Sequence, residues 1–193
     1  MSRGFPRLDS ALEAKLVERG RGSAADRDEV MSELFRLFRE PVLTLAFHVV
    51  GDRAEAEDVV QQVFLSVHGA LPMFRGDARL STWIYRIALR AAVAARSRRP
   101  RTEAIDEATS GPSFEQHLDL REEARRVARA MDRLSAEHRA VLSLFAIEEL
   151  SHQEIADILG VPEGTVWSRL SIARKRLHEA LASGSRPGDG ASR

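Results

Sequence analysis

The chain has 193 residues, of which 44% are hydrophobic and 30% are charged, and its 29 basic residues balance 29 acidic ones. This length and composition fit one large or two small globular domains. The sequence contains no cysteine, which excludes disulfide bonds and thiolate metal sites. Its six histidines lack the close spacing of metal ligands, so we expect no metal ion.

No segment of the sequence predicts insertion into a membrane. The N-terminus lacks the apolar core of a signal peptide, and there is no run of about 18 apolar residues that could span a bilayer. We therefore expect a cytoplasmic protein.

The zero net charge hides two blocks of opposite sign. Residues 75–101 contain eight arginines and one acid, whereas residues 102–123 contain seven acids and one arginine. The basic block suits a polyanion, and the acidic block, which includes a Thr-Ser-Gly-Pro-Ser run, predicts a flexible linker. The expected division is an N-terminal domain at 1–99, a linker at 100–118, a C-terminal domain at 119–182 and a disordered tail at 183–193.

Apolar residues at helical spacing predict four helices in the N-terminal domain. A short helix around Leu12 ends near Gly20, and a long one runs from about Asp26 to Val49, interrupted by Pro41. A third helix is expected at 53–70, with Asp52 as its N-cap, and a fourth at 80–97. The residues expected to face the core are Met31, Leu34, Phe35, Phe38, Val42, Leu45, Ala46 and Val49 in the long helix, Val59, Val60, Val63, Phe64 and Val67 in the third, and Leu80, Trp83, Ile84, Ile87, Ala88 and Ala91 in the fourth.

The third and fourth helices also present polar faces. Asp58, Gln61 and Gln62 lie opposite the Val59/Val63 stripe, and on their own they indicate only a solvated surface. Residues 71–79 form a loop with proline, glycine and Phe74. In the helix that follows, Arg79, Thr82, Arg86 and Arg90 share one face. Cations beside an aromatic side chain are typical of a single-strand nucleic-acid site. The alternative is that Phe74 and Trp83 belong to the core and the arginines are merely solvated; we expect Trp83 to be mostly buried.

Residues 151–177 predict two short helices joined by a tight turn. Ser151 and Glu154 can form a capping box, Gly160 can end the first helix, and Pro162 suits the first turn of the second. The second helix buries one stripe and exposes a basic exterior, which is typical of a helix-turn-helix that enters the DNA major groove. An ordinary helical hairpin with a solvated basic face is the alternative. The stripe consists of Val166, Leu170, Ala173 and Leu177.

No constellation for catalysis appears in the sequence. It has no glycine-rich phosphate loop, no GxSxG or HExxH motif and no paired carboxylates beside a histidine. The acidic pairs Glu122-Glu123 and Glu148-Glu149 are expected on solvated helix faces. We therefore expect neither an enzyme nor a bound cofactor.

Two motif sets resemble a known family. Residues 49–92, VVGDRAEAEDVVQQVFLSVHGALPMFRGDARLSTWIYRIALRAA, resemble region 2 of the extracytoplasmic-function (ECF) sigma factors, and residues 128–177, ARAMDRLSAEHRAVLSLFAIEELSHQEIADILGVPEGTVWSRLSIARKRL, resemble their region 4. The resemblance implies an all-α fold of two small domains, a region 2 helical bundle and a region 4 helix-turn-helix. It also implies a sigma factor that brings core RNA polymerase to promoters and is held inactive by an anti-sigma factor.

The resemblance assigns three sets of residues. Contact with the polymerase, through its β′ clamp helices, falls to Asp58, Gln61 and Gln62, and the β flap is a further expected polymerase partner. Reading of melted minus-10 DNA, with one base flipped into a pocket, falls to Phe74, Arg75, Asp77, Arg79, Thr82, Arg86 and Arg90. Reading of the minus-35 duplex falls to Glu163, Thr165, Trp167, Ser168, Arg169, Ser171, Arg174 and Lys175.

Three positions depart from the family pattern. Gln62 replaces a usual glutamate, Arg90 a common asparagine and Trp167 a common lysine. A stand-alone helix-turn-helix regulator is the alternative from another class, and a protein-interaction adaptor is a third. The region 2 match argues against the regulator, and the retained arginines argue against the adaptor.

Overall fold

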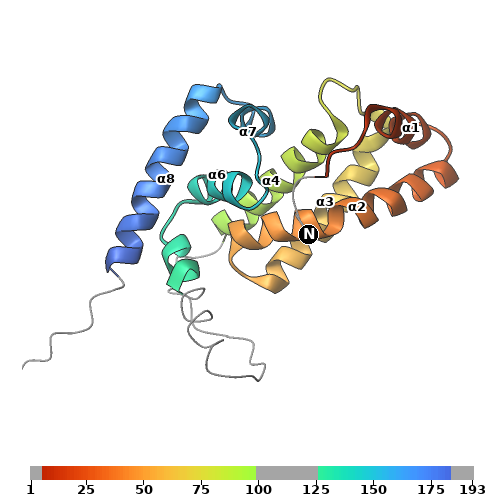
Figure 1. Ribbon diagram of the computed structural model, residues 1–193. Coiled ribbons are helices and arrows are strands. Elements are labelled where there is room, and N and C mark those ends of the chain that lie inside the picture. Colours follow the sequence, from red (N-terminus) through yellow and green to blue (C-terminus); the bar gives the residue numbers. More distant parts are fainter. Residues whose placement is uncertain (1–5, 99–125, 184–193) are drawn as a thin grey trace, which may run out of the picture.

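The computed structural model describes residues 6–98 and 126–183, and within these ranges the chain is helical with no strand (Figure 1). The predicted all-α class is therefore confirmed. The predicted linker at 100–118 and the pair Glu122-Glu123 lie outside the described residues, as does the tail beyond Ser183. The elements are α1 (Ser10–Gly20), α2 (Ala24–Val50), α3 (Arg53–Ala70), the 3-10 turn η1 (Leu71–Met73), α4 (Leu80–Arg98), a helical stretch at 126–132, α6 (Ala136–Ala146), α7 (His152–Leu159) and α8 (Glu163–Ser183).

The ends of the helices follow local sequence signals. Ser23 forms a capping box with Asp26 at the start of α2, which begins two residues before the predicted start. The helix continues through Pro41 and ends at Gly51, whose φ of 85° is left-handed. The Asp52 side chain then accepts from the backbone N–H of Glu55 at the start of α3, as the sequence predicts.

Helices α2, α3 and α4 pack together and bury the main core of the N-terminal half. Leu34, Phe38 and Val63 are fully buried, as predicted. Phe35 was expected in the core but is 43% exposed, and its ring meets the edge of Phe64 at a centroid distance of 4.9 Å. It lies at the border of the buried stripe, so that only one side of its ring is covered.

The buried face of α4 is rotated from the predicted one. Trp83, Ile87 and Ala91 are only partly buried, whereas Tyr85 and Leu89 are buried. The prediction assumed one core on one side of this helix. In the structure α4 also contacts α6 and α7, so its buried surface extends to a second side.

The C-terminal helices form the expected helix-turn-helix. Ser151 and Glu154 make the capping box of α7, and Gly160 ends that helix with a φ of 65°. Val166, Leu170 and Ala173 of α8 are buried against the rest of this unit, whereas Leu177 is partly buried.

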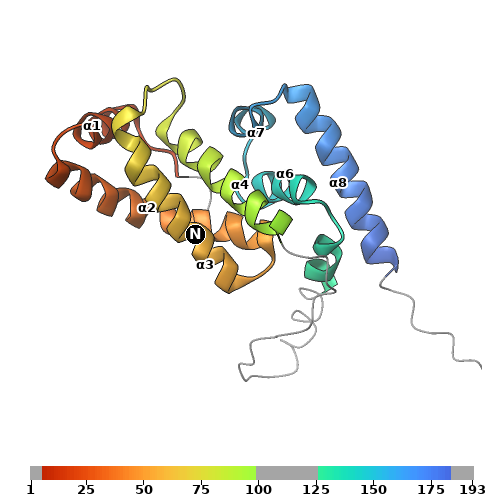
Figure 2. The same cartoon turned by 180° about the vertical axis from the view of Figure 1, so that it is seen from behind.

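The two helical units lie against each other. Helix α6 contacts α2 and α4, and α7 contacts α4, so that one continuous core cluster includes residues from both halves of the chain. Helix α8 is the outermost helix, at the end of the molecule opposite α1 (Figures 1 and 2). The face of α8 away from α6 and α7 is therefore open.

Candidate nucleic-acid interface

The open face of α8 carries small and charged side chains, most of the charged ones basic. Glu163, Ser168, Ser171 and Lys175 are exposed, while Val166 and Leu170 point inward and cannot reach a ligand. The Ser168 hydroxyl donates to the backbone oxygen of Thr165 at 2.9 Å, which leaves its oxygen lone pairs available as acceptors. Arg169 is partly buried and lies 3.7 Å from Glu137 of α6. Thr165 is also partly buried.

Trp167 belongs to a stack of rings that joins the three C-terminal helices. Its ring lies 4.0 Å from that of His152, at the start of α7, and the His152 ring lies 5.3 Å from Phe145 of α6. The Arg174 guanidinium lies 4.7 Å from the Phe145 ring centroid, within reach of a cation–π interaction. Trp167 is 56% exposed, so the stack fixes one side of the indole and leaves much of its surface accessible.

Phe74, in the segment at 71–79, is not exposed as a surface on which a base could stack. Phe74 is only 7% exposed, and its ring centroid lies 4.9 Å from that of Trp83. The reading of Phe74 as a core residue is therefore correct for this conformation. Arg75, Asp77 and Arg79 are exposed around it.

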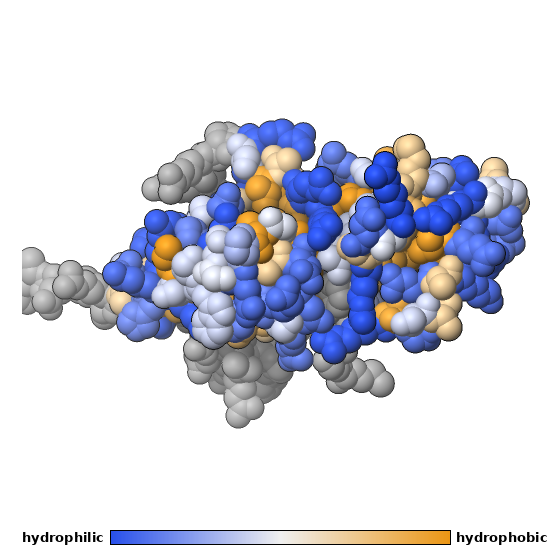
Figure 3. Space-filling view, turned by 90° about the horizontal axis from the view of Figure 1, so that it is seen from above, coloured by the Kyte–Doolittle hydropathy of each residue, from blue (hydrophilic) through white to orange (hydrophobic). Residues whose placement is uncertain are grey.

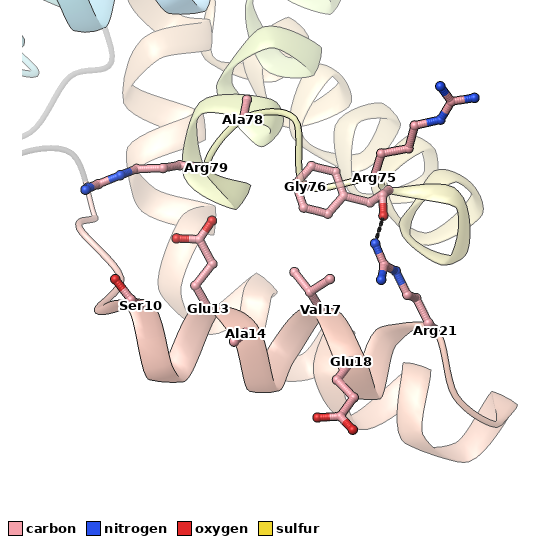
Figure 4. Close-up of a pocket in the computed structure, with 11 residues that line it drawn as sticks. Ser10, Glu13, Ala14, Val17, Glu18, Arg21, Arg75, Gly76, Ala78 and Arg79 are labelled. Atoms are coloured by element: carbon pink, nitrogen blue, oxygen red, sulfur yellow. Dashed lines mark hydrogen bonds between the residues drawn. The ribbon is translucent and has the colours of Figure 1, made fainter.

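An open pocket of about 630 Å³ lies between α1 and this segment (Figure 4). Glu13, Val17 and Arg21 point from the α1 side toward residues 74–79, whereas Glu18 points away. Seen from above, the end of the molecule that carries α1 shows apolar patches between strongly hydrophilic side chains (Figure 3). This pocket could not be predicted from the sequence, because its two walls are far apart along the chain.

The arginine face of α4 meets α7. The Arg86 Nε donates to the Asp157 backbone oxygen at 2.9 Å, and Arg90 Nε donates to the Arg86 backbone oxygen at 3.1 Å. Glu154 at the start of α7 pairs with Arg7 at 3.1 Å. Burial would raise the pKa of Glu154, but hydrogen bonds from Ser151 and the positive charges of Arg7 and Arg79 hold it below its ordinary value. Part of the cationic face is thus occupied by the C-terminal unit. Thr82 is partly buried on the same helix.

A buried carboxyl group lies where the two units meet. Glu148 is 2% exposed, and one of its carboxyl oxygens accepts a hydrogen bond from the Tyr85 hydroxyl at 2.9 Å. The prediction of a solvated helix face for Glu148 is wrong, because this residue follows the end of α6 and turns inward against α4. Of the pair Glu148-Glu149, only Glu149 is exposed. Burial raises the pKa of Glu148 to about 7, although the Tyr85 hydrogen bond favours the charged form.

Arg139 joins the same two units from α6. It is 1% exposed, and its guanidinium donates to the Val49 backbone oxygen at 3.1 Å and to the Asp132 carboxylate at 2.8 Å. Arg96 of α4 donates to the Val50 backbone oxygen at 3.3 Å. A Cβ atom at Gly51 would lie 3.1 Å from the Arg139 guanidinium, so a side chain there would crowd Arg139 in addition to straining the left-handed φ. No local pattern in the sequence indicates this cluster, because its members are far apart along the chain.

The exposed face of α3 holds the three candidates for polymerase contact. Asp58, Gln61 and Gln62 are all exposed, opposite the buried Val59 and Val63. Leu65 continues the same face at helical spacing and is 75% exposed. A single exposed leucine is normal on a protein surface, so Leu65 alone does not mark a contact site.

Among the residues that the structure describes, no group of His, Asp and Glu side chains could hold a metal ion. No helix within those same ranges is long and apolar enough to cross a membrane.

Comparison with known proteins gives matches for both halves of the chain. Residues 34–102 match Sigma-70 region 2, and residues 124–177 match Sigma-70, region 4. The RNA polymerase sigma-H factor of Pseudomonas aeruginosa is 34% identical over 158 residues, which cover 75% of this chain and 82% of that protein. The ECF RNA polymerase sigma-E factor of Escherichia coli is 36% identical over 138 residues, or 64% of this chain and 72% of that one.

Solved structures with the same fold include CnrH in complex with the cytosolic domain of CnrY, with a TM-score of 0.67 and 24% identity over 90% of this chain and 99% of CnrH. The sigma factor RpoE in complex with the anti-sigma factor NepR from Bartonella quintana has a TM-score of 0.59 and 23% identity over 80% of this chain and 98% of that one.

The chain belongs to the sigma-70 family. Within that family it is similar to the ECF sigma factors, and regions 2 and 4 serve promoter recognition and the initiation of transcription.

Proposed function

We propose that this chain binds core RNA polymerase through α3 and directs it to promoters by reading two DNA elements. Helix α8 reads the minus-35 duplex, and residues 74–90 read the melted minus-10 strand. The protein is a dissociable specificity subunit in the cytoplasm and has no enzymatic activity of its own. The observation that carries the proposal is the presence, in one chain, of an open basic helix-turn-helix and a region 2 bundle.

The proposed contact surfaces are divided between the two regions. The N-terminal unit, 1–99, holds the polymerase and minus-10 surfaces, and the C-terminal unit, 119–182, holds the minus-35 surface. An anti-sigma factor is a further proposed partner, because two proteins of the same fold were solved in complexes with CnrY and with the anti-sigma factor NepR. Because the Arg86 Nε donates to α7, movement of α7 away from α4 would free the whole guanidinium for DNA.

The direct test is run-off transcription with purified core polymerase on a library of genomic promoter fragments, with and without this protein. Transcripts that start at a shared set of promoters only when the protein is present would support the proposal. A stand-alone helix-turn-helix regulator would instead bind its operator without polymerase and produce no new start sites with core enzyme alone.

Charge reversal on the exposed face of α3 is expected to weaken polymerase binding. The double variant Asp58→Lys and Gln61→Lys should lower affinity for core about tenfold, because both side chains lie in the proposed contact surface and away from the buried stripe. Core binding is measured by titration with a labelled chain, and circular dichroism checks the fold. The same charge reversal at the exposed Glu179 of α8 is the matched control. Equal core affinity for the double variant and the wild type would remove α3 from the proposal.

Substitutions on α8 are expected to fall into two classes. In the proposed orientation of α8, Arg174 contacts a phosphate, whereas Ser168 and Ser171 face base edges. Arg174→Ala should therefore weaken binding to all minus-35 variants about equally and reduce the salt slope by roughly one unit, because a phosphate contact carries no sequence information. Ser168→Ala or Ser171→Ala should change the preferred minus-35 base, at a cost of about 1–3 kcal/mol for a good contact. Transcription from a minus-35 library measures both effects. If Arg174→Ala shifts base preference while the serine variants scale all sites uniformly, the proposed orientation of α8 is wrong.

A further inference from the structure

Helix α1 and its C-cap residue Arg21 contact both ends of the segment that joins η1 to α4. At one end, the Arg21 guanidinium donates to the backbone oxygen of Phe74 (Figure 4). At the other end, the Glu13 carboxylate accepts from the backbone N–H of Leu80, the first residue of α4. The proposed minus-10 loop, residues 74–79, lies between these two attachments.

The contact from Glu13 supplies what the loop lacks at the start of α4. The first intrahelical hydrogen bond runs from the Trp83 N–H to the Arg79 oxygen, so Arg79 occupies the N-cap position. An arginine side chain has only donors and cannot satisfy the free N–H groups of a helix start. Glu13 provides both an acceptor and a negative charge at the positive end of the α4 dipole.

An apolar contact fixes the far end of α1. Gly20 is buried, and a Cβ atom there would come within 2.6 Å of the Leu71 side chain in η1. Leu71 is itself fully buried, so it has little freedom to move away. Glycine at position 20 thus allows α1 to lie directly against the turn that precedes the loop.

Helix α1 also forms one wall of the pocket described above. Glu13, Val17 and Arg21 follow one another at spacings of four and point toward the loop. The match to Sigma-70 region 2 begins at residue 34, so α1 lies outside it.

We propose that α1 is a splint for the minus-10 loop, in which Glu13 and Arg21 act as positioning residues that hold residues 74–79 in the conformation that meets single-stranded DNA. This inference rests on the proposed function of that loop. It predicts that the two side chains affect recognition of the melted strand without touching either the polymerase or the minus-35 element.

The test uses the reconstituted holoenzyme and promoters selected by the run-off assay. Each promoter is made as a forked fragment, with a duplex minus-35 element and a single-stranded minus-10 element, and as a duplex that ends before the minus-10 element. Glu13→Ala and Arg21→Ala are each expected to weaken binding to the forked fragment about fivefold or more, with unchanged binding to the short duplex and to core. Glu13→Gln, which keeps an acceptor oxygen, should recover most of that loss.

Glu18→Ala is the matched control, because it removes the same charge from α1 on the side that points away from the loop. Minus-10 base preference on forked fragments and the unfolding temperature are measured for every variant. Binding of Glu13→Ala equal to that of the wild type overturns the splint. The splint is also overturned if Glu13→Gln loses as much binding to the forked fragment as Glu13→Ala and if both losses parallel a fall in unfolding temperature. That result would show a purely structural role for Glu13. A wild-type holoenzyme that does not distinguish the forked fragment from the short duplex would instead overturn the proposed function of the loop.

Discussion

Replacing Arg139 with alanine is expected to lower the free energy of unfolding by about 3 kcal/mol. The Arg139 guanidinium is almost completely buried and donates to both the Val49 backbone oxygen and the Asp132 carboxylate. Its removal leaves a backbone acceptor and a negative charge without these donors, and it empties the space of a long side chain between α6 and the end of α2. Denaturant titration followed by circular dichroism measures the change.

Two further variants separate the causes. Arg133→Ala removes the same type of side chain from an exposed position nearby and should change stability by no more than about 0.5 kcal/mol. Arg139→Lys keeps the charge but offers a single ammonium in place of the planar guanidinium, so it should recover only part of the loss. If the free energies of unfolding of Arg139→Ala and Arg133→Ala agree within error, the buried contacts of Arg139 make no net contribution to stability.

The helix boundaries could be predicted because their signals are local. The capping box at Ser151, the left-handed Gly160 and the Asp52 cap each depend on residues within a few positions of one another. The same holds for the buried stripe of α8, which follows from helical periodicity alone. The resemblance to the two sigma regions rested on longer motif sets, at residues 49–92 and 128–177.

The contacts between the two units could not be predicted in the same way. The hydrogen bond from Tyr85 to Glu148 joins residues 63 positions apart, and that from Arg139 to Val49 spans 90 positions. Within the N-terminal unit, the Glu13 contact with Leu80 spans 67 positions. Periodicity assigns a charged residue to a solvated face unless the sequence also reveals the neighbour that buries it. This is why Glu148 was misassigned and why α1 received no role. Phe35 was misassigned in the opposite sense, because helical periodicity extended the buried stripe to a position that the neighbouring helices cover only in part.

The second large effect concerns pH and arises from Glu148. Its pKa is raised from 4.5 to about 7 by burial at the contact between the two units. Below the lower value the group is protonated in both the folded and the unfolded chain, so the stability associated with the neutral carboxyl is fully present. As the pH rises toward 7, the unfolded chain loses the proton first, and the folded state loses up to about 3 kcal/mol before the curve levels.

Histidines act in the opposite direction and must be separated from this effect. The pKa of His48 is lowered by burial, and that of His138 is lowered by burial and by the charge of Arg176, so both favour folding as the pH rises toward 6.5. The variant Glu148→Gln keeps these histidines and retains an acceptor for the Tyr85 hydroxyl, but it cannot ionise. The difference between the two unfolding free energies at each pH therefore isolates the carboxyl group.

Relative to the wild type, the unfolding free energy of Glu148→Gln is expected to increase by about 3 kcal/mol between about pH 4.5 and pH 7. Above this range the difference between the two proteins should be constant. Glu149→Gln, at the exposed neighbouring position, should follow the wild type throughout.

Because Glu148 is buried by α4, separation of the two units would expose it to water just as unfolding does. Higher pH should therefore also favour release of α7 from Arg86, and labels on α3 and α8 should report a larger mean separation at about pH 8 than at about pH 6 in the wild type but not in Glu148→Gln. A pH-independent difference in unfolding free energy would show that the carboxyl group ionises equally easily in the folded and unfolded chains.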